Sequence, residues 1–226
     1  MAKRGALIVV EGLDRAGKST QCGLLVKNLE ARGHDVRYVK FPDRSTPTGT
    51  IINQYLTGQA QQDDHVIHLL FAANRWEAAA RITSDIAAGT TVIVDRYCYS
   101  GCVYSAAKDI PGIDLEWARW PDVGLPRPDV CIFLELSADT AAARAGFGGE
   151  RYENQAMQAR VRALFYELRT VYEKDIFHVI DGGESRDTVE DNVLQAVLAQ
   201  LQQIDTSASD QALGTIQPLR SRSHQS

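Results

Sequence analysis

The sequence predicts a three-layer α/β fold in which a five-stranded parallel sheet carries helices on both faces. First, short apolar, β-branched runs alternate with segments of helical period, and this alternation is typical of a parallel sheet. Second, residues 6–10 are apolar without interruption, as expected of a central strand covered on both faces. Third, a glycine-rich turn at residues 12–17 separates this strand from the helical segment that follows.

The strands follow one another along the chain with helical segments between them. We expect strands at residues 6–10, 36–41, 91–95, 130–134 and 177–180.

Two helices precede the third strand. One is expected at residues 18–32 and a longer one at residues 63–88, and a glycine ends each of them. In the longer helix, the helical spacing puts one set of apolar residues on one face. These residues are Val66, Leu69, Leu70 and Ala73.

Another helical period begins at Met157, before the fifth strand. The glycine-rich stretch at residues 146–149 precedes it and predicts a mobile loop. Residues 1–204 are expected to form one domain, because 226 residues with 44% hydrophobic content can bury one sizeable core. Residues 205–226 lack apolar periodicity and are expected to be a largely disordered tail.

The net charge of −5 argues against a nucleic-acid partner, because such proteins neutralise phosphates over a broad basic face. The first apolar run is too short for a signal peptide or a membrane span. We therefore expect a soluble cytoplasmic protein, and the nucleus stays open as a second compartment. The four cysteines lack the spacing of a zinc site and are expected to be reduced, buried thiols.

The turn at residues 12–19 has the pattern G-x-x-x-x-G-K-[ST], and it lies between a buried strand and a helix. In this P-loop, successive backbone N–H groups and the helix N-terminus can surround phosphate oxygens. Lys18 is expected to reach the terminal phosphates, and the Ser19 hydroxyl can bind Mg²⁺. The pattern predicts a P-loop NTPase-like fold that binds ATP with Mg²⁺.

Charged residues inside and opposite this loop indicate a second substrate. Asp14 would be repelled by a triphosphate, so a sugar hydroxyl is a better partner for it, while Arg15 can stabilise a transferred phosphoryl group. Arg44 and Arg96 follow the second and third strands and are expected to converge near the loop. Two guanidinium groups there predict a second phosphate, and the acceptor is expected to be a nucleoside monophosphate.

Five segments resemble thymidylate kinases of the eukaryotic type, which carry a basic residue in the P-loop. The resemblance covers residues 5–200 and implies that the chain transfers the γ-phosphoryl group of ATP to dTMP, giving ADP and dTDP. It also implies a homodimer and a lid over ATP formed by the glycine-rich loop. The segments are residues 11–20, 41–44, 70–77, 95–97 and 150–153.

The resemblance also implies roles for individual residues. Arg15, Lys18 and Arg96 would be catalytic, and Ser19 and Asp95 would organise Mg²⁺. ATP would be bound by Gly12, Arg15, Ala16, Gly17, Lys18, Ser19, Thr20, Arg144, Asp181, Gly182 and Gly183.

For dTMP, the resemblance implies that Phe71 stacks on the thymine and that Arg75 donates to a base carbonyl. Arg44 and Arg96 would hold the monophosphate. Asp14 would accept from the 3′-hydroxyl, and Tyr97 and Tyr152 would pack against the deoxyribose. The full expected set is Asp14, Phe41, Pro42, Arg44, Phe71, Arg75, Arg96, Tyr97, Ser100, Gly101, Tyr104, Tyr152 and Gln158.

The sequence leaves two related kinase activities open and disfavours two other functions. A kinase of another nucleoside monophosphate stays open, as does a deoxynucleoside kinase, in which Asp43 would be the base. A GTP-binding switch is disfavoured because no lysine lies in an [NT]-K-x-D motif. An inactive nucleotide-binding module is disfavoured because Lys18, Ser19 and Asp95 are all present. Val103 and Tyr104 depart from the family pattern, in which a smaller residue and often a phenylalanine are expected.

Overall fold

The computed structural model describes residues 3–137, 140, 151–152, 155–206 and 212–219. Its centre is a parallel sheet with the strand order β2-β3-β1-β4-β5. The strands are β1 (Leu7–Gly12), β2 (Val36–Lys40), β3 (Thr91–Asp95), β4 (Val130–Glu135) and β5 (Phe177–Asp181). The P-loop strand β1 is therefore central, and its carboxyl end lies between those of β3 and β4.

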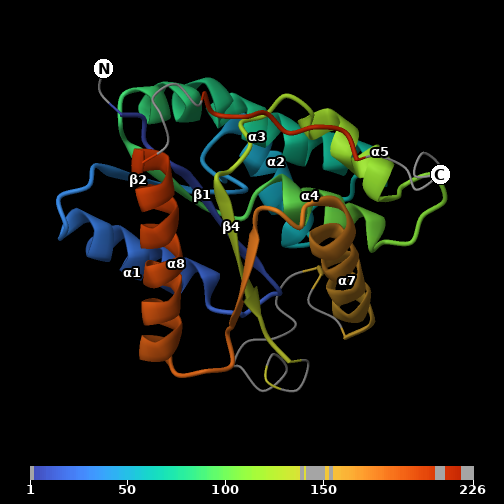
Figure 1. The fold of residues 1–226 in the computed structure, drawn as a ribbon. Helices are drawn as coiled ribbons and strands as arrows, with labels where there is room; N and C mark the ends of the chain where they lie inside the picture. Colours follow the sequence, from blue (N-terminus) through green and yellow to red (C-terminus); the bar gives the residue numbers. More distant parts are fainter. Residues whose placement is uncertain (1–2, 138–139, 141–150, 153–154, 207–211, 220–226) are drawn as a thin grey trace, which may run out of the picture.

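Helices cover both faces of this sheet (Figure 1). On one face lie α1 (Lys18–Glu30) and α8 (Arg186–Thr206). The elements of the other side are α2 (Pro47–Leu56), α3 (Asp64–Ala87), α4 (Cys98–Ala106), α5 (Leu115–Arg119), the 3₁₀ turn η1 (Trp120–Asp122), α7 (Gln155–Glu167) and the π-helical segment η2 (Leu168–Tyr172).

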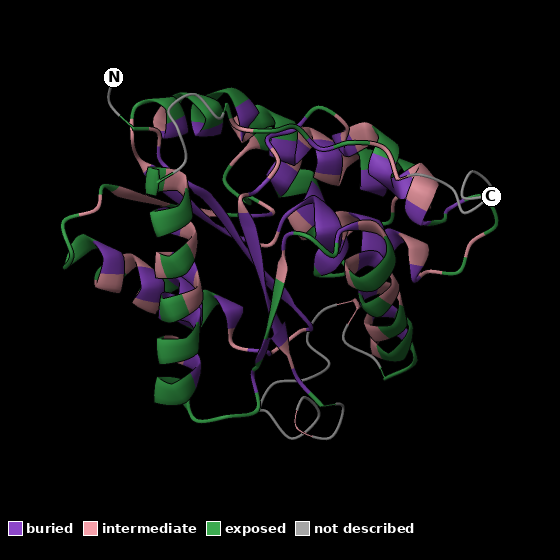
Figure 2. Ribbon diagram, in the orientation of Figure 1, coloured by how far each residue is buried: buried purple, intermediate pink, exposed green. Residues whose placement is uncertain are grey.

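The two core layers follow from the alternation of side chains along β1. Leu7 and Val9 contribute to the layer under α3, α4 and α7, whereas Ile8 and Val10 contribute to the layer under α1 and α8. The strand is fully buried, as Figure 2 shows for the centre of the sheet. This explains why its sequence is apolar without alternation, and the predicted fold class is confirmed.

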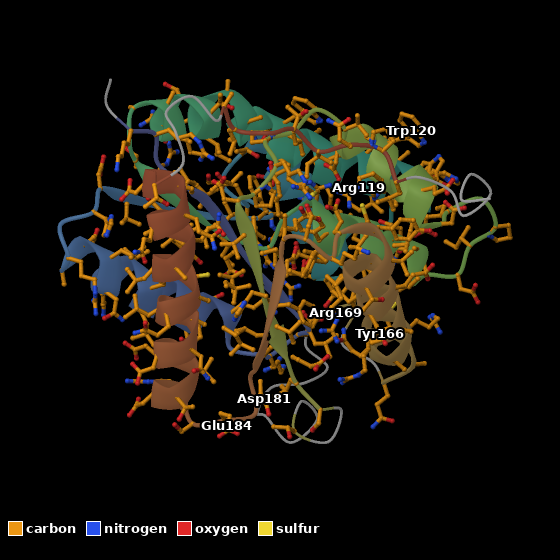
Figure 3. The ribbon with its side chains drawn as sticks, viewed as in Figure 1. Arg119, Trp120, Tyr166, Arg169, Asp181 and Glu184 are labelled. Carbon is orange, nitrogen blue, oxygen red and sulfur yellow. The ribbon has the colours of Figure 1, made fainter. Side chains whose placement is uncertain are left out.

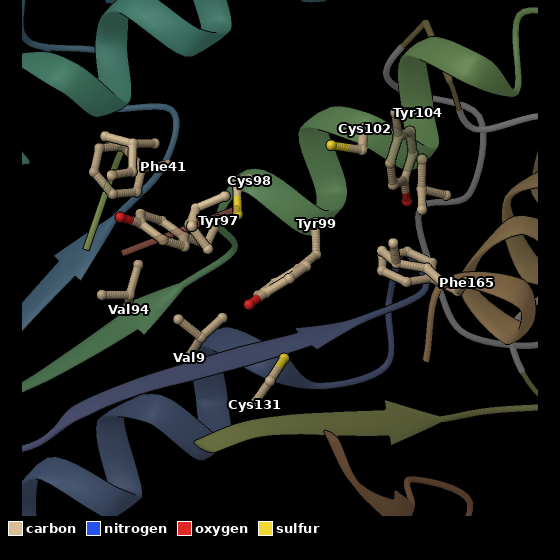
Figure 4. Packing of buried hydrophobic residues seen from close by; sticks show 14 of the residues in the cluster. Val9, Phe41, Val94, Tyr97, Cys98, Tyr99, Cys102, Tyr104, Cys131 and Phe165 are labelled. Atoms are coloured by element: carbon tan, nitrogen blue, oxygen red, sulfur yellow. The ribbon is translucent and has the colours of Figure 1, made fainter. Parts of the chain in front are cut away.

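The four cysteines are free and buried, as expected. In Figure 4, Cys98 and Cys102 lie on α4, and Cys131 lies on β4 below them in this view. Burial raises the pKa of the Cys98 and Cys131 thiols, so they act as small apolar groups in the core. Among the described helices, none combines the length and apolar character that a membrane-spanning helix needs.

The face of α3 that packs inward differs from the expected one. Val66 and Leu69 are 45% and 48% exposed, while Ile67 and three polar residues are buried. The buried polar residues are His68, Asn74 and Arg75. Because each of these polar side chains has a hydrogen-bond partner on another element, the inner face accommodates them beside its apolar residues, while Val66 and Leu69 remain outside.

Within the segment expected to be a disordered tail, the structure describes residues 205–206 and 212–219. Helix α8 continues to Thr206, and residues 212–219 lie against the loop that follows η1. The Ile216 N–H donates to the Leu125 carbonyl, and the Gly124 N–H donates to the Ile216 carbonyl. The Ile216 side chain is fully buried in the core beside α5. Buried Ile216, the partly buried Leu213 and Leu219, and three backbone hydrogen bonds hold this segment, and they leave no periodic pattern in the sequence.

Candidate active site

The P-loop runs from the end of β1 to the first turn of α1. Gly12 and Gly17 have φ values of 147° and 91°, which side chains rarely allow. A Cβ on Gly12 would also come within 2.5 Å of the Leu134 carbonyl oxygen. Gly17 is the N-cap of α1 and no side chain caps the helix, so its first N–H groups point toward a ligand position.

Lys18 is buried at the start of α1, and its Nζ donates to the Leu13 carbonyl at 2.6 Å. Burial lowers the pKa of Lys18 to about 7, although Asp14 and Asp95 partly oppose this shift. A bound phosphate would offset the cost of the buried charge. The side chain is therefore placed to favour an anionic ligand.

Oxygen atoms gather where α1 meets the end of β3. The Ser19 hydroxyl donates to the Asp95 carboxylate, and the Tyr38 hydroxyl donates to the same carboxylate at 3.0 Å. The Lys40 ammonium lies 3.2 Å from the Ser19 Oγ and 3.7 Å from Asp95. Hydroxyl and carboxylate oxygens are the ligands that Mg²⁺ prefers, so Ser19 and Asp95 fit the expected metal.

The turn after β5 lies beside the P-loop. A Cβ on Gly182 would come within 3.0 Å of the Glu135 carbonyl oxygen and 3.4 Å of the Ala16 carbonyl oxygen. The Gly183 N–H donates to the Asp181 carboxylate at 2.8 Å. Figure 3 places Asp181 and Glu184 together near the carboxyl end of β5. The expected ATP residues of this turn thus adjoin the loop, whereas Arg144 and the glycine-rich stretch lie outside the described residues.

The loop after β2 forms part of the opposite wall, and Asn74 of α3 fixes its path. The Asn74 amide accepts from the Asp43 N–H at 2.7 Å and donates to the Asp43 carbonyl and the Thr46 hydroxyl. Thr46 in turn caps α2. This arrangement holds Arg44 over the cavity, where its Nη1 donates to Asn53 at 2.9 Å.

Arg96 and Asp14 meet across the centre of the site. The Arg96 guanidinium donates to Asp14 through Nη2 and to Ser100 Oγ through Nη1, the latter at 3.1 Å. The second Asp14 oxygen accepts from Gln158 of α7 at 2.8 Å. Burial opposes ionisation of Asp14, but Arg96 and Lys18 lower its pKa overall. Asp14 is therefore ionised and can accept hydrogen bonds.

Arg75 is buried on α3 and held from behind. Its Nε and Nη2 each donate to the Asp122 carboxylate at 2.8 Å. Its remaining nitrogen, Nη1, lies beside Gly101, where a Cβ would be only 2.9 Å away. Arg75 thus lines the cavity with its position fixed by two parallel hydrogen bonds.

Aromatic residues close the far end of the cavity. The rings of Tyr104 and Tyr152 have their centres 5.6 Å apart, and Phe71 lines the same wall from α3. Tyr97 also touches the cavity, but it is only 1% exposed and its hydroxyl donates to the Pro126 carbonyl. Little of the Tyr97 ring is left to contact a sugar.

These residues line one cavity of about 910 Å³, large enough for two nucleotides in contact. Of the expected residues, those lining it are Asp14, Arg15, Gly17, Lys18, Ser19, Thr20, Phe41, Pro42, Arg44, Phe71, Arg75, Asp95, Arg96, Tyr97, Ser100, Gly101, Tyr104 and Tyr152. Gly12, Ala16, Gln158 and the turn at residues 181–183 adjoin this lining.

Comparison with known proteins identifies the family. The family model described as thymidylate kinase matches residues 10–193. The chain belongs to the thymidylate kinase family. It is 46% identical to the thymidylate kinase of Arabidopsis thaliana over 88% of this chain and 73% of that one. It is 44% identical to the thymidylate kinase of Homo sapiens over 85% of this chain and 89% of that one.

A solved structure agrees with the family assignment. The thymidylate kinase of Candida albicans matches with a TM-score of 0.85 and 36% identity, over 96% of this chain and 100% of that one. The resemblance stated from the sequence motifs is thereby confirmed.

Several residues of this site were not predicted from the sequence. Lys40 and Ser105 line the cavity, Tyr38 reaches Asp95, and Asp122 holds Arg75. Lys40 directly precedes the Phe41-Pro42 pair, so its place at the end of the strand could have predicted that it lines the site. No sequence pattern indicates the role of Asp122, because its partner Arg75 lies 47 residues away in the sequence.

The candidate base of a deoxynucleoside kinase has the wrong environment for that role. The Asp43 carboxylate accepts from the Ser45 hydroxyl at 2.6 Å and from the Ser45 N–H at 3.0 Å. These hydrogen bonds lower the pKa of Asp43, which weakens it as a proton acceptor. The lowered pKa of Asp43 therefore favours a phosphate group over a sugar hydroxyl as the acceptor, in agreement with the thymidylate kinase family.

Proposed function

We propose that this chain transfers the γ-phosphoryl group of ATP to dTMP, giving ADP and dTDP. One observation carries the proposal. In a chain of the thymidylate kinase family, the P-loop residues Gly17 to Thr20 and the three arginines Arg44, Arg75 and Arg96 line opposite walls of the same cavity. Two phosphorylated ligands can therefore meet inside it.

ATP would lie along the P-loop and the turn after β5. The unsatisfied N–H groups at the start of α1 and the Lys18 ammonium would hold its terminal phosphates. Ser19 and Asp95 would hold Mg²⁺, which neutralises phosphate charge when it is bound. Gly182 allows the close approach of the neighbouring turn, where the adenosine would be accommodated.

The acceptor would occupy the arginine and aromatic side of the cavity. Phe71 would stack on the thymine and Arg75 would donate from Nη1 to a base carbonyl, so that stacking supplies affinity and the hydrogen bond supplies base choice. Arg44 and Arg96 would hold the monophosphate. Asp14 would exchange its contact with Arg96 for the sugar 3′-hydroxyl.

The chemistry needs charge stabilisation more than proton transfer. A phosphate monoester has a second pKa near 6, so it is already a dianionic nucleophile at neutral pH. The obstacle is repulsion between two polyanions brought to about 3 Å. Lys18, Arg15 and Arg96 supply positive charge around the position of the transferred group.

A substrate panel tests this function. ADP release should be measured by a coupled assay with ATP·Mg²⁺ and, in turn, dTMP, dUMP, UMP and thymidine. The proposal requires dTMP to give the highest kcat/KM and thymidine to give no turnover. Faster turnover of thymidine than of dTMP would instead identify a deoxynucleoside kinase.

We also propose that two copies of the chain pair through α3. The exposed or half-exposed apolar residues of this helix follow spacings of three and four, which form a continuous seam along one side. Such a self-complementary stripe suits a two-fold homodimer. The residues are Val66, Leu69, Ala73, Trp76 and Ala80.

A further inference from the structure

Glu11 is a fully buried carboxylate with no part in the proposed chemistry. It ends the apolar run of β1, directly before Gly12 of the P-loop. One of its oxygens accepts from the N–H groups of Tyr97 and Ser100, both at 2.9 Å. The other accepts from the Ser100 hydroxyl at 2.5 Å. Burying a carboxylate is costly, so three donors aimed at it indicate a specific role.

These donors lie at the start of α4. Glu11, near the end of β1, therefore caps the N-terminus of this helix. Tyr97 is the N-cap residue of α4, and its own side chain makes no capping hydrogen bond. Just before it, Arg96 has a left-handed backbone with φ of 67°, which costs energy for a residue with a side chain. The Arg96 N–H donates to Val10 and the next N–H donates to Glu11. Glu11 thus helps to hold the turn that presents Arg96.

The Ser100 hydroxyl connects Glu11 to the Arg96 guanidinium. A hydroxyl has one proton, and Ser100 donates it to Glu11. Its oxygen is therefore left as an acceptor toward Arg96 Nη1, 3.1 Å away. Arg96 Nη2 then meets Asp14. Burial raises the pKa of Glu11, whereas Arg96 and the donors from Ser100 and Tyr97 favour its charged form.

We propose that Glu11 is a positioning residue for Arg96, acting through the Ser100 hydroxyl and the α4 N-terminus to aim the guanidinium at the acceptor's phosphate. The inference rests on the proposed function, because it concerns the group that holds dTMP. Glu11 itself touches no substrate in this account.

The first test is Glu11→Gln, which keeps the shape of the side chain and removes its charge. We expect the KM for dTMP to rise about tenfold, while the KM for ATP changes less than about twofold. The reason is that the Arg96 guanidinium, which would lose its fixed orientation, holds the acceptor's phosphate. The matched control is Glu173→Gln. Glu173 is also buried, and it pairs with Arg119 and Arg127 away from the cavity.

This control separates positioning from simple destabilisation. Glu173→Gln should lower the melting temperature and leave both KM values of the folded enzyme unchanged. Equal effects of Glu11→Gln on the two KM values, or an effect on stability alone, would overturn the proposal.

A double-mutant cycle tests the route through Ser100. If Glu11 acts on Arg96 through this hydroxyl, Ser100→Ala already removes part of what Glu11→Gln removes. The double variant should then raise the dTMP KM by clearly less than the product of the two single effects. A rise equal to that product would show independent action and overturn the proposed route.

Two further outcomes also decide between these proposals. If Glu11→Gln does not fold, Ser100→Ala decides alone: an increase of about threefold or more in the dTMP KM with an unchanged ATP KM supports the proposal, and an unchanged dTMP KM overturns it. Wild-type protein without dTMP-dependent turnover would overturn the proposed function itself. Normal wild-type turnover with unaltered dTMP KM in both variants would overturn this inference only.

Discussion

Arg15 lies inside the P-loop with a left-handed backbone, at φ of 63°. Glycine adopts this conformation readily, so Arg15→Gly removes the side chain without straining the loop. Because Arg15 is placed to stabilise charge on the transferred group, we expect kcat to fall by at least about 100-fold. The KM for ATP should change little. Steady-state kinetics with ATP and dTMP measure both values.

A second arginine serves as the control for this variant. Arg32 lies just after α1, and its guanidinium donates to Asn28 of that helix, so Arg32→Ala should leave kcat unaltered. Turnover of Arg15→Gly equal to that of the wild type would remove Arg15 from the mechanism.

Gly101 is where the acceptor site has least room. A Cβ there would lie 2.7 Å from Arg75 Nη2, and Arg75 cannot retreat without losing Asp122. We expect Gly101→Ala to raise the KM for dTMP by about tenfold or more, because the displaced guanidinium no longer meets the base.

Gly23→Ala is the matched control for Gly101→Ala, since a Cβ on this helical glycine would meet nothing within 4 Å. It should leave both KM values unchanged and stabilise the protein slightly. If Gly101→Ala behaves like Gly23→Ala, the described packing of Arg75 against Gly101 is wrong.

Individual residues were predictable from the sequence where their partners are close in the chain. The P-loop residues form one short pattern, so Lys18 and Ser19 could be assigned directly. Glu11 could not, because its donors on Tyr97 and Ser100 lie 86 and 89 residues away. A glutamate after an apolar run otherwise indicates only the end of a strand.

At the scale of single elements, α3 carries a buried titratable group. His68 is fully buried, and its Nδ1 lies 2.7 Å from the Ser105 Oγ. Burial lowers the pKa of His68 from its usual 6.5 to about 4. Between these values the unfolded chain binds a proton that the folded protein does not bind. The free energy of unfolding should therefore fall as the pH drops from 6.5 to 4, by on the order of 3 kcal/mol from this group.

Chemical denaturation across this pH range tests the effect on His68→Gln, which keeps a hydrogen-bonding side chain toward Ser105. The variant should lose less stability than the wild type as the pH falls. His65→Gln, an exposed position on the same helix, should follow the wild type. Parallel curves for all three proteins would show that His68 is not held neutral by folding.

The inner face of α3 could not be predicted because polar residues share it with apolar ones. Apolar periodicity pointed to Val66 and Leu69, which are exposed, whereas Asn74 and Arg75 are buried and find hydrogen-bond partners on other elements. Helix α4 was also not predicted from the sequence. Cys98 to Ser105 are almost all buried, so α4 shows no polar face to reveal its period.

For the molecule as a whole, the apolar seam on α3 predicts self-association. We expect the wild type to be a dimer by size-exclusion chromatography with light scattering. Leu69→Glu should shift it to the monomer, because two like charges would face each other near the two-fold axis.

Val171→Glu is the control for surface charge, since Val171 is similarly exposed, at 45%, but lies in η2. This variant should remain dimeric. A wild-type monomer, or equal effects of both substitutions, would contradict pairing through α3.

The arrangement of layers was predictable, whereas the strand order and the course of residues 212–219 were not. Unbroken apolar strands such as β1 can lie only in the centre of a covered sheet, which fixes the fold class. The order β2-β3-β1-β4-β5 depends on crossovers between distant segments. The segment at 212–219 is held by the burial of Ile216 and by backbone hydrogen bonds to a loop distant in the sequence.

The central claim is direct phosphoryl transfer between two nucleotides in one cavity. Phosphorus NMR of a reaction containing ATP, Mg²⁺ and dTMP measures this most directly. Direct transfer predicts that dTDP and ADP appear in equal amounts, without free phosphate in the early phase. Formation of inorganic phosphate in place of dTDP, or no reaction by folded protein, would contradict it.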